Sequence, residues 1–437
     1  MLNHIRNTIQ SYVHDHSRAF SIMASLPVWA VAYAWRTLLV RTTFVAITGS
    51  FGKTTAKECL AAMLATAGPT ARTPGNWNGR MGIAGSLLRV RPWHRFAVIE
   101  TGTDEPGGLV KASMLLRPHV VLVLCVAGAH TQGFGDLEAT AKEKSRLLRF
   151  LRKDGTAVLN GDDDRVAAMA VDARERRVIA FGLEEGRDVR ADDVSSIWPA
   201  RLEMTVSTKT QQERVTTLLV GTHWTNSVLG AIAAATACGV TLQKAAEGLA
   251  DVPPYSGRMC PETLPNGAVV LRDDFNGCID GFHRAIDVLR DARAERKILV
   301  MTDCSDFRKN PRKRMNFYAR VAHETADMVI FIGERCEYGV ARAIREGMTP
   351  DQAHGRFKLE EAAELLQQVA RPGDLILLRG RGTDHVARVY FRMLGSVRCK
   401  RVKCPLMMLC DRCPKLGFKP ETSDTTSPVA VSSQTRV

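Results

Sequence analysis

The sequence predicts an α/β protein with two sheet domains in series. Short apolar runs of strand length alternate with longer segments of helical periodicity from residue 44 to residue 394, as in parallel strands joined by helices. A segment rich in proline and glycine at 253–257 divides this alternation into two blocks. We therefore expect a central domain with a mostly parallel sheet, followed by a C-terminal Rossmann-like α/β domain.

The composition is that of a soluble globular protein and narrows the choice of partners. Of 437 residues, 45% are apolar and 24% are charged, which is ordinary for two or three globular domains. The formal net charge of +14 suits an anionic partner: a nucleotide, a carboxylated substrate, nucleic acid or a membrane surface. An aromatic content of 6% without an RNA-stacking motif argues against nucleic acid. Eleven mostly scattered cysteines and no secretory signal indicate a cytoplasmic protein.

Residues 1–43 are expected to form an N-terminal helical extension. Residues 19–40 are largely apolar, but Pro27 and several arginines interrupt or bracket them, so they make no clean membrane span. Two arrangements stay open: a helix packed on the first domain, which we favour, and an interfacial helix that gives peripheral membrane contact through residues 19–41. The aromatic and basic side chains concerned are Trp29, Tyr33, Trp35, Arg36 and Arg41.

The first block opens with a glycine-rich turn between a strand and a helix. Apolar residues 44–47 predict a buried strand, and residues 56–65 have helical periodicity. The turn between them, residues 48–55, has the context of a phosphate-binding loop, whose backbone amides surround phosphate oxygens. Lys53 would reach the β- and γ-phosphates of a nucleotide, and the Thr54 hydroxyl would bind Mg²⁺.

The spacing of this turn departs from the general phosphate-loop pattern. Only Ser50 and Phe51 separate Gly49 from Gly52, where the general pattern has about four residues. The alternative interpretation is a Gly-Lys turn beside an ordinary strand. Because a strand and a helix flank the turn in the required order, we interpret it as the nucleotide site of a P-loop ATPase domain.

Polar residues follow the next predicted strands of the block. Residues 96–100 form an apolar run that ends in Glu100, and His130 follows the run at 120–126. The carboxyl ends of parallel strands share one edge of a sheet and line its ligand crevice. Since the phosphate loop belongs to the same edge, Glu100 and His130 predict a ligand site there.

Four further elements complete the first block: a helix at 138–151, a strand and turn at 157–163, shorter strands at 178–220 for which an antiparallel arrangement is open, and an alanine-rich helix at 222–239. The helix at 138–151 carries Lys142 and Lys144. The alanine-rich helix begins with His223 and Asn226.

The second block is expected to span residues 255–395, after a first domain that covers 44–254. Four strands are expected in it, at 268–271, 298–302, 328–332 and 375–378. Asp273 and Asp274 follow the first of them, again at a crevice position. The basic run at 308–314 would bind an acidic substrate or form a solvated face.

The tail differs in composition from the two blocks. Within residues 396–418, four cysteines suit a tetrahedral Zn²⁺ site, with an iron–sulfur cluster as the second option and free thiols as the third. Residues 419–437 are rich in Ser and Thr and poor in apolar residues, so they are expected to be disordered. The cysteines are Cys399, Cys404, Cys410 and Cys413.

An ordered set of short motifs resembles the Mur ligase family, the ATP-dependent amide-forming enzymes of peptidoglycan assembly. Each motif is a weak signal alone, but their order and rough spacing match from residue 45 to residue 394, with the strongest resemblance to members that add D-alanyl-D-alanine. The motifs are residues 48–55, 75–78, 100–102, 129–130, 133–135, 141–144, 160–163, 221–223 with 226, 257–259 and 273–276.

The resemblance implies carboxylate activation with ATP and Mg²⁺. ATP phosphorylates a carboxylate, an amine attacks the acyl phosphate, and phosphate leaves. The resemblance assigns the phosphates to Gly49, Ser50, Gly52, Lys53, Thr54 and Thr55, one Mg²⁺ to Thr54 and Glu100, a second Mg²⁺ to His130, the adenine to Asn226 with His223 close by, the nucleotide to Arg258 and Asp274, and the substrate side to Asn76 and Asn78. Lys144 matches a lysine that is carbamylated in many members; without the resemblance it would be a solvated helix lysine.

Two departures from the family pattern bear on the substrate. Residues 1–43 are too few for the domain with which the peptidoglycan ligases bind UDP-sugar, and residues 302–307 differ from the family's loop at that point. We therefore expect an ATP-dependent ligase that joins an amino-acid or peptide-type carboxylate to an amine. The alternatives are a true UDP-muramoyl peptide ligase and a non-catalytic ATP-binding regulatory partner.

Overall fold

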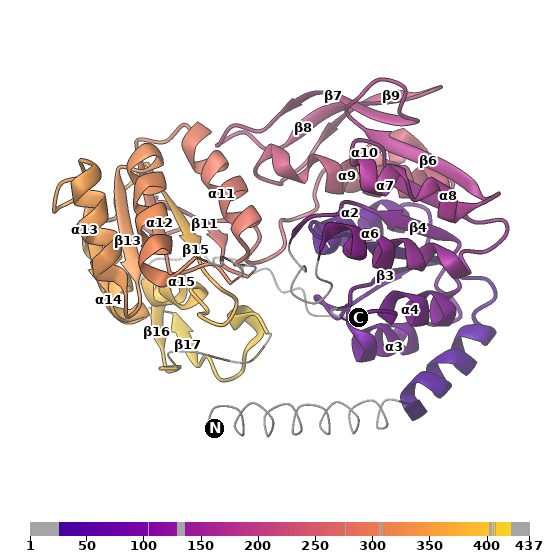
Figure 1. Cartoon of the computed structure of the whole chain (residues 1–437), viewed down its shortest axis with the longest axis horizontal. Coiled ribbons are helices and arrows are strands. Elements are labelled where there is room, and N and C mark those ends of the chain that lie inside the picture. The colour runs from indigo at the N-terminus through magenta and orange to yellow at the C-terminus, as the bar shows by residue number, and fades with distance from the viewer. Residues whose placement is uncertain are drawn as a thin grey trace. The chain divides into compact units, whose positions relative to one another are not determined.

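The computed structural model describes residues 26–420, apart from 104, 129–135, 276, 306, 308, 402, 403, 405 and 407. The chain divides into two compact units (Figure 1). Met1–Tyr255 and His283–Arg293 form the first unit, and Ser256–Phe282 with Ala294–Val437 form the second. Helix α11 (Ile279–Asp291) therefore contains a boundary between the units. The division at Tyr255 falls in the proline- and glycine-containing segment.

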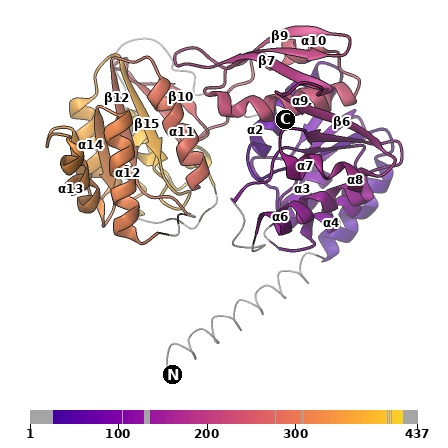
Figure 2. The same ribbon diagram turned by 45° about the horizontal axis from the view of Figure 1, so that its top comes forward.

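The first unit is built on a nine-stranded sheet in the order β2-β3-β1-β4-β5-β6-β7-β8-β9. Pairing is parallel from β2 to β7 and antiparallel from β7 to β9. The expected mostly parallel sheet is thus confirmed, with its antiparallel strands at one end (Figure 2). The strands are β1 (Thr43–Thr48), β2 (Thr70–Arg72), β3 (Phe96–Glu100), β4 (Val120–Val123), β5 (Thr156–Asn160), β6 (Arg177–Gly182), β7 (Val189–Ser195), β8 (Glu203–Thr208) and β9 (Gln212–Thr216).

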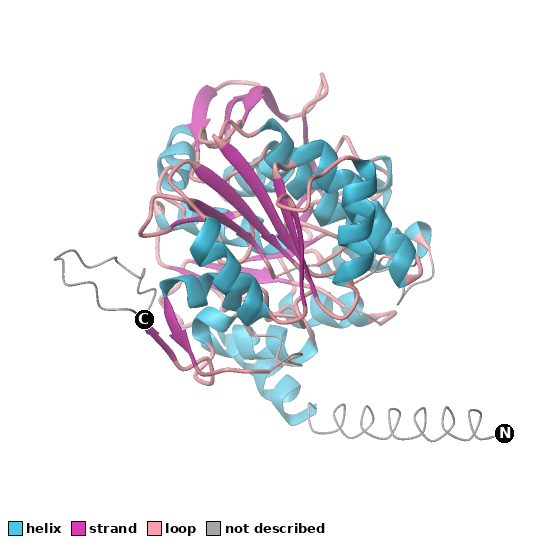
Figure 3. Ribbon diagram, turned by 90° about the vertical axis from the view of Figure 1, so that its left-hand side faces the viewer, coloured by secondary structure: helices cyan, strands magenta, loops and turns pink. Residues whose placement is uncertain are grey.

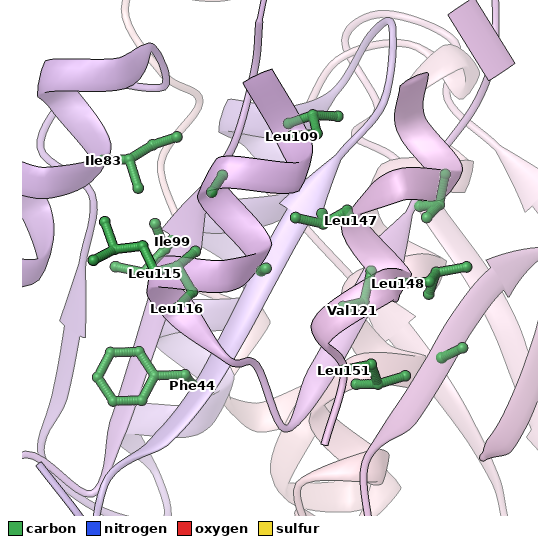
Figure 4. Packing of buried hydrophobic residues seen from close by; sticks show 14 of the residues in the cluster. Phe44, Ile83, Ile99, Leu109, Leu115, Leu116, Val121, Leu147, Leu148 and Leu151 are labelled. Carbon is green, nitrogen blue, oxygen red and sulfur yellow. The ribbon is translucent and has the colours of Figure 1, made fainter. Parts of the chain in front are cut away.

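Helices cover both faces of this sheet, which is why its parallel strands are continuous apolar runs. Figure 4 shows one face, where Phe44 and Val121 of the sheet pack with Leu115 and Leu148 of the covering helices. On the other face, Leu122 approaches α9. The first face carries α3 (Arg80–Arg89), α4 (Gly108–Leu116), α6 (Leu137–Ser145), η2 (Arg146–Phe150), α7 (Asp164–Ala167) and α8 (Ala170–Ala173); the second carries α2 (Lys53–Ala65), α9 (Thr225–Ala237) and α10 (Leu242–Leu249).

The described part of the N-terminal extension is a helix at residues 26–38, and it packs on the first unit. The Trp35 indole N–H donates to the Val90 carbonyl oxygen at 2.9 Å. The Arg36 Nε donates to the Leu116 carbonyl oxygen at 2.7 Å. Within the described residues, a helix with the length and apolar character needed to cross a membrane is absent.

The second unit has a six-stranded sheet in the order β10-β11-β15-β12-β13-β14. Only β10 is antiparallel to its neighbour; the other pairs are parallel, as expected for a Rossmann-like domain. In Figure 3 the strands of this sheet lie between helices. The strands are β10 (Cys260–Thr263), β11 (Val269–Asp273), β12 (Arg296–Met301), β13 (Met328–Ile332), β14 (Ala353–Arg356) and β15 (Asp374–Arg379). The helices are α12 (Pro311–Thr325), α13 (Cys336–Glu346), α14 (Leu359–Val369) and α15 (Ala387–Leu394).

A short C-terminal subdomain follows the second sheet. Strands β16 (Gly395–Val397) and β17 (Phe418–Pro420) pair antiparallel, and the turn η4 (Cys410–Arg412) lies between them in the chain. A small apolar cluster joins this subdomain to α15 through Ala387, Val397, Cys410 and Leu416.

One histidine, directly before β4, is expected to make the first unit sensitive to acid. His119 Nδ1 accepts a hydrogen bond from the Phe44 backbone N–H at 3.0 Å, so this nitrogen must be unprotonated. Burial, and then the charges of Arg152 and Arg36, lower the pKa of His119 to about 4. The unfolded chain has the ordinary pKa of about 6.5. As the pH falls from 6.5 towards 4, the unfolded chain binds a proton that the folded chain does not, and stability is lost.

We expect His119→Asn to remove this acid sensitivity, because the asparagine side-chain oxygen keeps the acceptor and does not titrate. Relative to the variant, the wild-type protein should lose about 1–3 kcal/mol of unfolding free energy between pH 7 and pH 4, a range that allows for the partial exposure of the ring. Urea unfolding at pH 4, 5, 6 and 7 measures the difference. Equal pH slopes for the two proteins would contradict the assignment.

Candidate functional site

The glycine-rich turn after β1 is held in a conformation that requires glycine. Gly52 has a φ of +74°, and a Cβ there would lie 2.0 Å from Ser227 Oγ of α9. The turn is also tied to the segment after β4. The Ser50 backbone N–H donates to the Cys125 carbonyl oxygen at 2.9 Å, and Ser50 Oγ donates to the Ala127 carbonyl oxygen at 3.1 Å. The loop is therefore fixed on both sides, with its glycines packed against neighbouring elements.

The predicted phosphate-binding side chains lie at the start of α2. Lys53 Nζ donates to the Gly49 carbonyl oxygen across the turn at 2.7 Å. Thr54 and Thr55 are buried in the first turn of the helix. At the start of α9, the Asn226 Oδ1 atom is buried without a hydrogen-bond partner among the described residues. The structure thus places the turn and the start of α9 together, as nucleotide binding needs.

Glu100 ends β3 with one carboxylate oxygen fixed and the other available. Its Oε1 accepts from Asn78 Nδ2 at 2.7 Å, and its backbone N–H donates to Thr73 Oγ1 at 3.0 Å. Its Oε2 is buried and has no hydrogen-bond partner within the described chain. An unpartnered buried carboxylate oxygen is costly unless something binds it, and a hard oxygen donor fits Mg²⁺. Glu100 therefore suits the Mg²⁺ role that the family resemblance implies for it together with Thr54.

A cavity of about 280 Å³ brings several predicted residues together. Lys53, Asn78 and Lys144 all line it. Lys144 is only 7% exposed, so it is not a solvated helix lysine. Trp29 and Arg80 line the same cavity.

The position of Lys144 follows from how α6 is anchored. Asp136 caps the helix by accepting from the Ala139 backbone N–H at 2.7 Å. The neighbouring Glu143 carboxylate accepts from the Gly107 and Leu109 backbone N–H groups at 2.8 and 2.9 Å. These bonds tie the last turn of α6 to the first turn of α4, which borders the cavity.

Three predicted positions need separate mention. His130, the predicted ligand of a second Mg²⁺, lies outside the described residues, as do residues 133–135 and Asn276. His223 lies in η3 (Thr222–Trp224), where its ring packs against the Trp224 ring with centroids 4.5 Å apart. Asn76 belongs to the turn before α3.

Arg258 and Asp274 belong to the second unit, where they lie within a network of buried charges. The Arg258 guanidinium lies over the Phe275 ring, 5.4 Å from its centroid. Asp274 is ion-paired with Arg272 at 3.2 Å. Arg272 also donates two hydrogen bonds to Asp411, at 2.7 and 2.9 Å. The C-terminal subdomain thus supplies a carboxylate that helps to hold the residue beside Asp274.

Asp273, which precedes Asp274, forms a second buried pair. Its carboxylate accepts from Arg379, whose guanidinium also donates to the Asp273 and Cys278 carbonyl oxygens at 3.1 and 2.8 Å. Burial raises the pKa of Asp273, and the positive charges of Arg379 and Arg258 oppose that rise. The two adjacent aspartates therefore have different arginine partners.

The four tail cysteines do not form the expected zinc site. They line one small cavity together with His385, and Cys410 Sγ lies 3.3 Å from His385 Nδ1. Yet no group of three or more His, Cys, Asp or Glu side chains in the described chain is placed to hold a metal ion. Burial raises the pKa of the Cys410 thiol to about 12, the direction expected for a cysteine in an apolar cluster. The subdomain packs through apolar contacts instead.

The basic run after β12 is partly used within the second unit. Arg314 pairs with Asp303 at 2.6 Å, and the Tyr318 hydroxyl donates to the same carboxylate at 3.0 Å. The residues of the run in the first turn of α12 are exposed or half-buried, and Arg308 lies outside the described residues. This agrees with a solvated helix face anchored by one internal ion pair.

Comparison with known proteins places the chain in a family. Residues 47–235 match the Mur ligase middle domain, and residues 257–382 match the Mur ligase, glutamate ligase domain. The chain belongs to the Mur ligase family. The resemblance drawn from the ordered motifs is therefore confirmed, and so is the two-domain α/β fold.

Named relatives in this family are UDP-N-acetylmuramoyl-tripeptide–D-alanyl-D-alanine ligases. The protein of Escherichia coli (strain K12) is 32% identical over 274 residues, which cover 62% of this chain and 60% of that protein. The chain thus spans less than two thirds of the length of that relative. The protein of Mycobacterium tuberculosis H37Rv is 27% identical over 411 residues, which cover 89% of this chain and 80% of that protein.

Solved structures agree with this placement. A crystal structure of MurF from Acinetobacter baumannii superposes with a TM-score of 0.77 at 25% identity, covering 84% of this chain and 80% of that chain. MurF of Thermotoga maritima in complex with ADP shares the fold, with a TM-score of 0.69 at 21% identity and coverage of 83% and 82%. These MurF-type relatives are ADP-forming acid–amino-acid ligases.

Arg80 and Trp29 are among the cavity residues that the sequence does not predict for the site. Arg80 directly follows the turn at 75–79, so its place beside a motif of the family could have indicated that it lies near the site. Trp29 was read only as part of a packed or interfacial helix, because nothing local to the sequence shows which loop a helix at residues 26–38 will touch.

Proposed function

We propose that this protein is an ATP-dependent ligase that joins a carboxyl group of a muramoyl-peptide type of peptidoglycan precursor to an amine, with release of ADP and phosphate. The observation that carries the proposal is the cavity shared by Lys53 and Lys144, within a chain of the Mur ligase family. The named relatives favour a peptidoglycan precursor over the general amino-acid or peptide substrate that the sequence analysis puts first. D-Alanyl-D-alanine is the corresponding candidate for the amine.

The proposed chemistry has two steps. A carboxylate oxygen attacks the γ-phosphorus of ATP, the bond between that phosphorus and the β–γ bridging oxygen breaks, and ADP leaves. The amine nitrogen then attacks the acyl carbon, the amine loses its proton, and the bond between the acyl carbon and the phosphate oxygen breaks. The first step brings two anions together, so it depends on positive charge and on precise positioning.

Each described site residue has a part in this chemistry. Lys53 and the backbone amides of residues 49–55 would hold the phosphates. Thr54 and Glu100 would bind Mg²⁺, which neutralises part of the triphosphate charge when it is bound. Lys144 would face the reacting carboxyl group directly or, as a carbamate, help to support a metal ion.

The remaining assignments come from the family resemblance. Asn226 would contact the adenine, and the unpartnered Oδ1 atom at the start of α9 supports this role. Arg258 and Asp274 would contact the nucleotide from the second unit. His130 would hold a second Mg²⁺.

A product assay with the full chain tests the proposal. The protein is incubated with ATP, Mg²⁺ and D-alanyl-D-alanine, together with UDP-N-acetylmuramoyl-tripeptide, the same compound without UDP, or free amino acids. ADP release and mass spectrometry of the products should show an amide only when both the carboxyl and the amine substrate are present. ATP turnover that is independent of a carboxylate would contradict the proposal. If products formed from free amino acids alone, the general amino-acid or peptide substrate would be favoured instead.

A further inference from the structure

The cavity contains an arginine that the proposed chemistry does not use. Arg80 is the first residue of α3 and lines the same cavity as Lys53 and Lys144. Its guanidinium carbon lies 5.5 Å from the centroid of the Trp29 ring. Trp29 comes from the helix at residues 26–38, so this corner of the cavity is formed by two segments far apart in the sequence.

Three polar atoms of this corner lack hydrogen-bond partners among the described residues. Arg80 Nε and Nη1 are both buried, and neither has a hydrogen-bond partner in the described part of the chain. The Trp29 indole Nε1 is buried and unpartnered in the same way. A buried donor without a partner has a higher free energy than the same donor in water, and this cost is largest for a charged group. These three buried donors point to an acceptor that the described residues do not provide.

The charge of the cavity fits an anionic acceptor. Among the residues that line it, Lys53, Arg80, Lys111 and Lys144 are cationic, and Glu105 is the acidic one. A guanidinium presents donors in a planar fork that matches the two oxygens of a carboxylate or phosphate. The Trp29 ring gives the guanidinium a cation–π contact but no hydrogen-bond acceptor, so the unpartnered Nε and Nη1 donors of Arg80 are left for such a group.

Both segments are held in place before any ligand binds. The helix at residues 26–38 is fixed by the hydrogen bonds of Trp35 and Arg36 described above. At the start of α3, a Cβ on Gly82 would lie 2.4 Å from the Trp77 carbonyl oxygen, so the helix packs closely on the turn before it. Arg80 is therefore presented by a rigid backbone, as a binding residue should be.

We propose that Arg80, stacked on Trp29, binds a second anionic group of the carboxyl substrate, a carboxylate or phosphate that does not react. This rests on the proposed function, since it assumes that the cavity takes the carboxyl substrate. The anion has two possible sources: a side carboxylate of the peptide, or a phosphate of a nucleotide carrier. The site selects substrates that carry an anion at a distance from the activated carboxyl group.

Binding measurements test the proposal without relying on turnover. Calorimetric titrations use protein saturated with Mg²⁺ and a non-hydrolysable ATP analogue. The probes are UDP-N-acetylmuramoyl-tripeptide, the same compound without UDP, and the same compound with its non-reacting carboxyl groups amidated. Arg80→Gln should weaken binding of the full compound by about ten- to a hundredfold, the size of a lost charge-assisted bidentate contact. Arg80→Lys should restore part of this loss.

The pattern across the probes identifies the anion. If the phosphate is bound, the effect of Arg80→Gln disappears for the probe without UDP; if a carboxylate is bound, it disappears for the amidated probe. Arg89→Gln is the matched control, because Arg89 is an exposed arginine on the same helix, and it should bind all probes as the wild type does. Trp29→Phe, which keeps an aromatic face, should have a smaller effect than Arg80→Gln.

Two results would overturn the subsite. One is equal binding of all probes by Arg80→Gln and wild-type protein; the other is a wild-type chain that binds none of the probes. Failure of the proposed function has a different signature, in which ADP release is absent while the binding difference between the two proteins persists. In a turnover assay, Arg80→Gln should raise KM for the carboxyl substrate and leave kcat within about threefold, since the contact is equally present before and during reaction.

Discussion

Lys53→Ala is expected to reduce ADP formation at least about a hundredfold, with little change in stability. Lys53 spans the glycine-rich turn to the Gly49 carbonyl oxygen, which places its ammonium group where phosphates would lie. In the proposed reaction, alanine removes a positive charge that would stabilise the transferring phosphoryl group. Loss of one such preorganised electrostatic contact typically lowers kcat by about 10²–10³. Alanine is a good helix former, so α2 should still begin at this position.

Steady-state ADP release by Lys53→Ala, measured with the best substrate pair from the product assay, gives the effect on kcat and KM. Lys142→Ala is the control, because Lys142 is an exposed lysine of α6, two residues from the buried Lys144. It should retain wild-type rates. If the Lys53→Ala protein kept more than about a tenth of the wild-type kcat, the glycine-rich turn would have no major part in the reaction.

The glycine-rich turn, which is the proposed nucleotide end of the site, could be located from local sequence. The turn at 48–55 carries its own signals, a strand before it, a helix after it and glycines between. Glu100 was predicted because β3 is a continuous apolar run that ends at that residue. In such segments the residues that do the chemistry and the residues that define the element are neighbours in the chain, so a single sequence contains enough information.

The limits of strand β4 show where local reasoning fails. The sequence predicts a strand over 120–126, but β4 ends at Val123. Beyond it, the Leu124 carbonyl oxygen accepts from the Asn160 side chain, and the Val126 backbone N–H donates to Asp163. Polar side chains at the end of β5 and in the turn after it thus bond the backbone beyond β4. Hydrophobicity cannot show this, because these side chains lie 36 and 37 residues further along the chain.

For a related reason, the sequence does not predict the short edge strands or the contact between Arg80 and Trp29 in the cavity. Strands β2, β10 and β14 have three or four residues each and mixed polar sequences, so they carry almost no periodicity. The stacking of Arg80 on Trp29 joins residues 51 positions apart, which no periodicity reports. The cysteine hypothesis failed in the opposite way: spacing suggested metal ligation, whereas the turn at 410–412 uses Asp411 to bond Arg272.

Arg379→Met is expected to destabilise the second unit by about 3–5 kcal/mol, the typical cost of removing one partner of a buried ion pair. Arg379 is 2% exposed and is the main partner of the Asp273 carboxylate. Methionine has a similar length but no charge. It would leave Asp273 buried with only the weaker influence of Arg258 and would also remove the donors to the Cys278 carbonyl oxygen.

The pH dependence of this loss separates a charge effect from a packing effect. Without Arg379 the pKa of Asp273 rises further, because burial already raises it and the main opposing charge is gone. The folded variant then keeps a proton that the unfolded chain releases above its ordinary pKa of about 3.9. The destabilisation should therefore be smaller at pH 5 than at pH 8. A loss caused by packing alone would be the same at both.

Urea unfolding at pH 5 and pH 8 measures both quantities, with Arg165→Met as the control. Arg165 pairs with Glu138 at 2.6 Å on the surface of the first unit, with 40% and 74% of the two side chains exposed. An exposed pair of this kind contributes between about 0 and 1 kcal/mol. If Arg379→Met cost no more than Arg165→Met, the buried pair at the end of β11 would not hold the strand end that presents Asp274. The position of Asp274 would then depend on its contact with Arg272, which Asp411 holds.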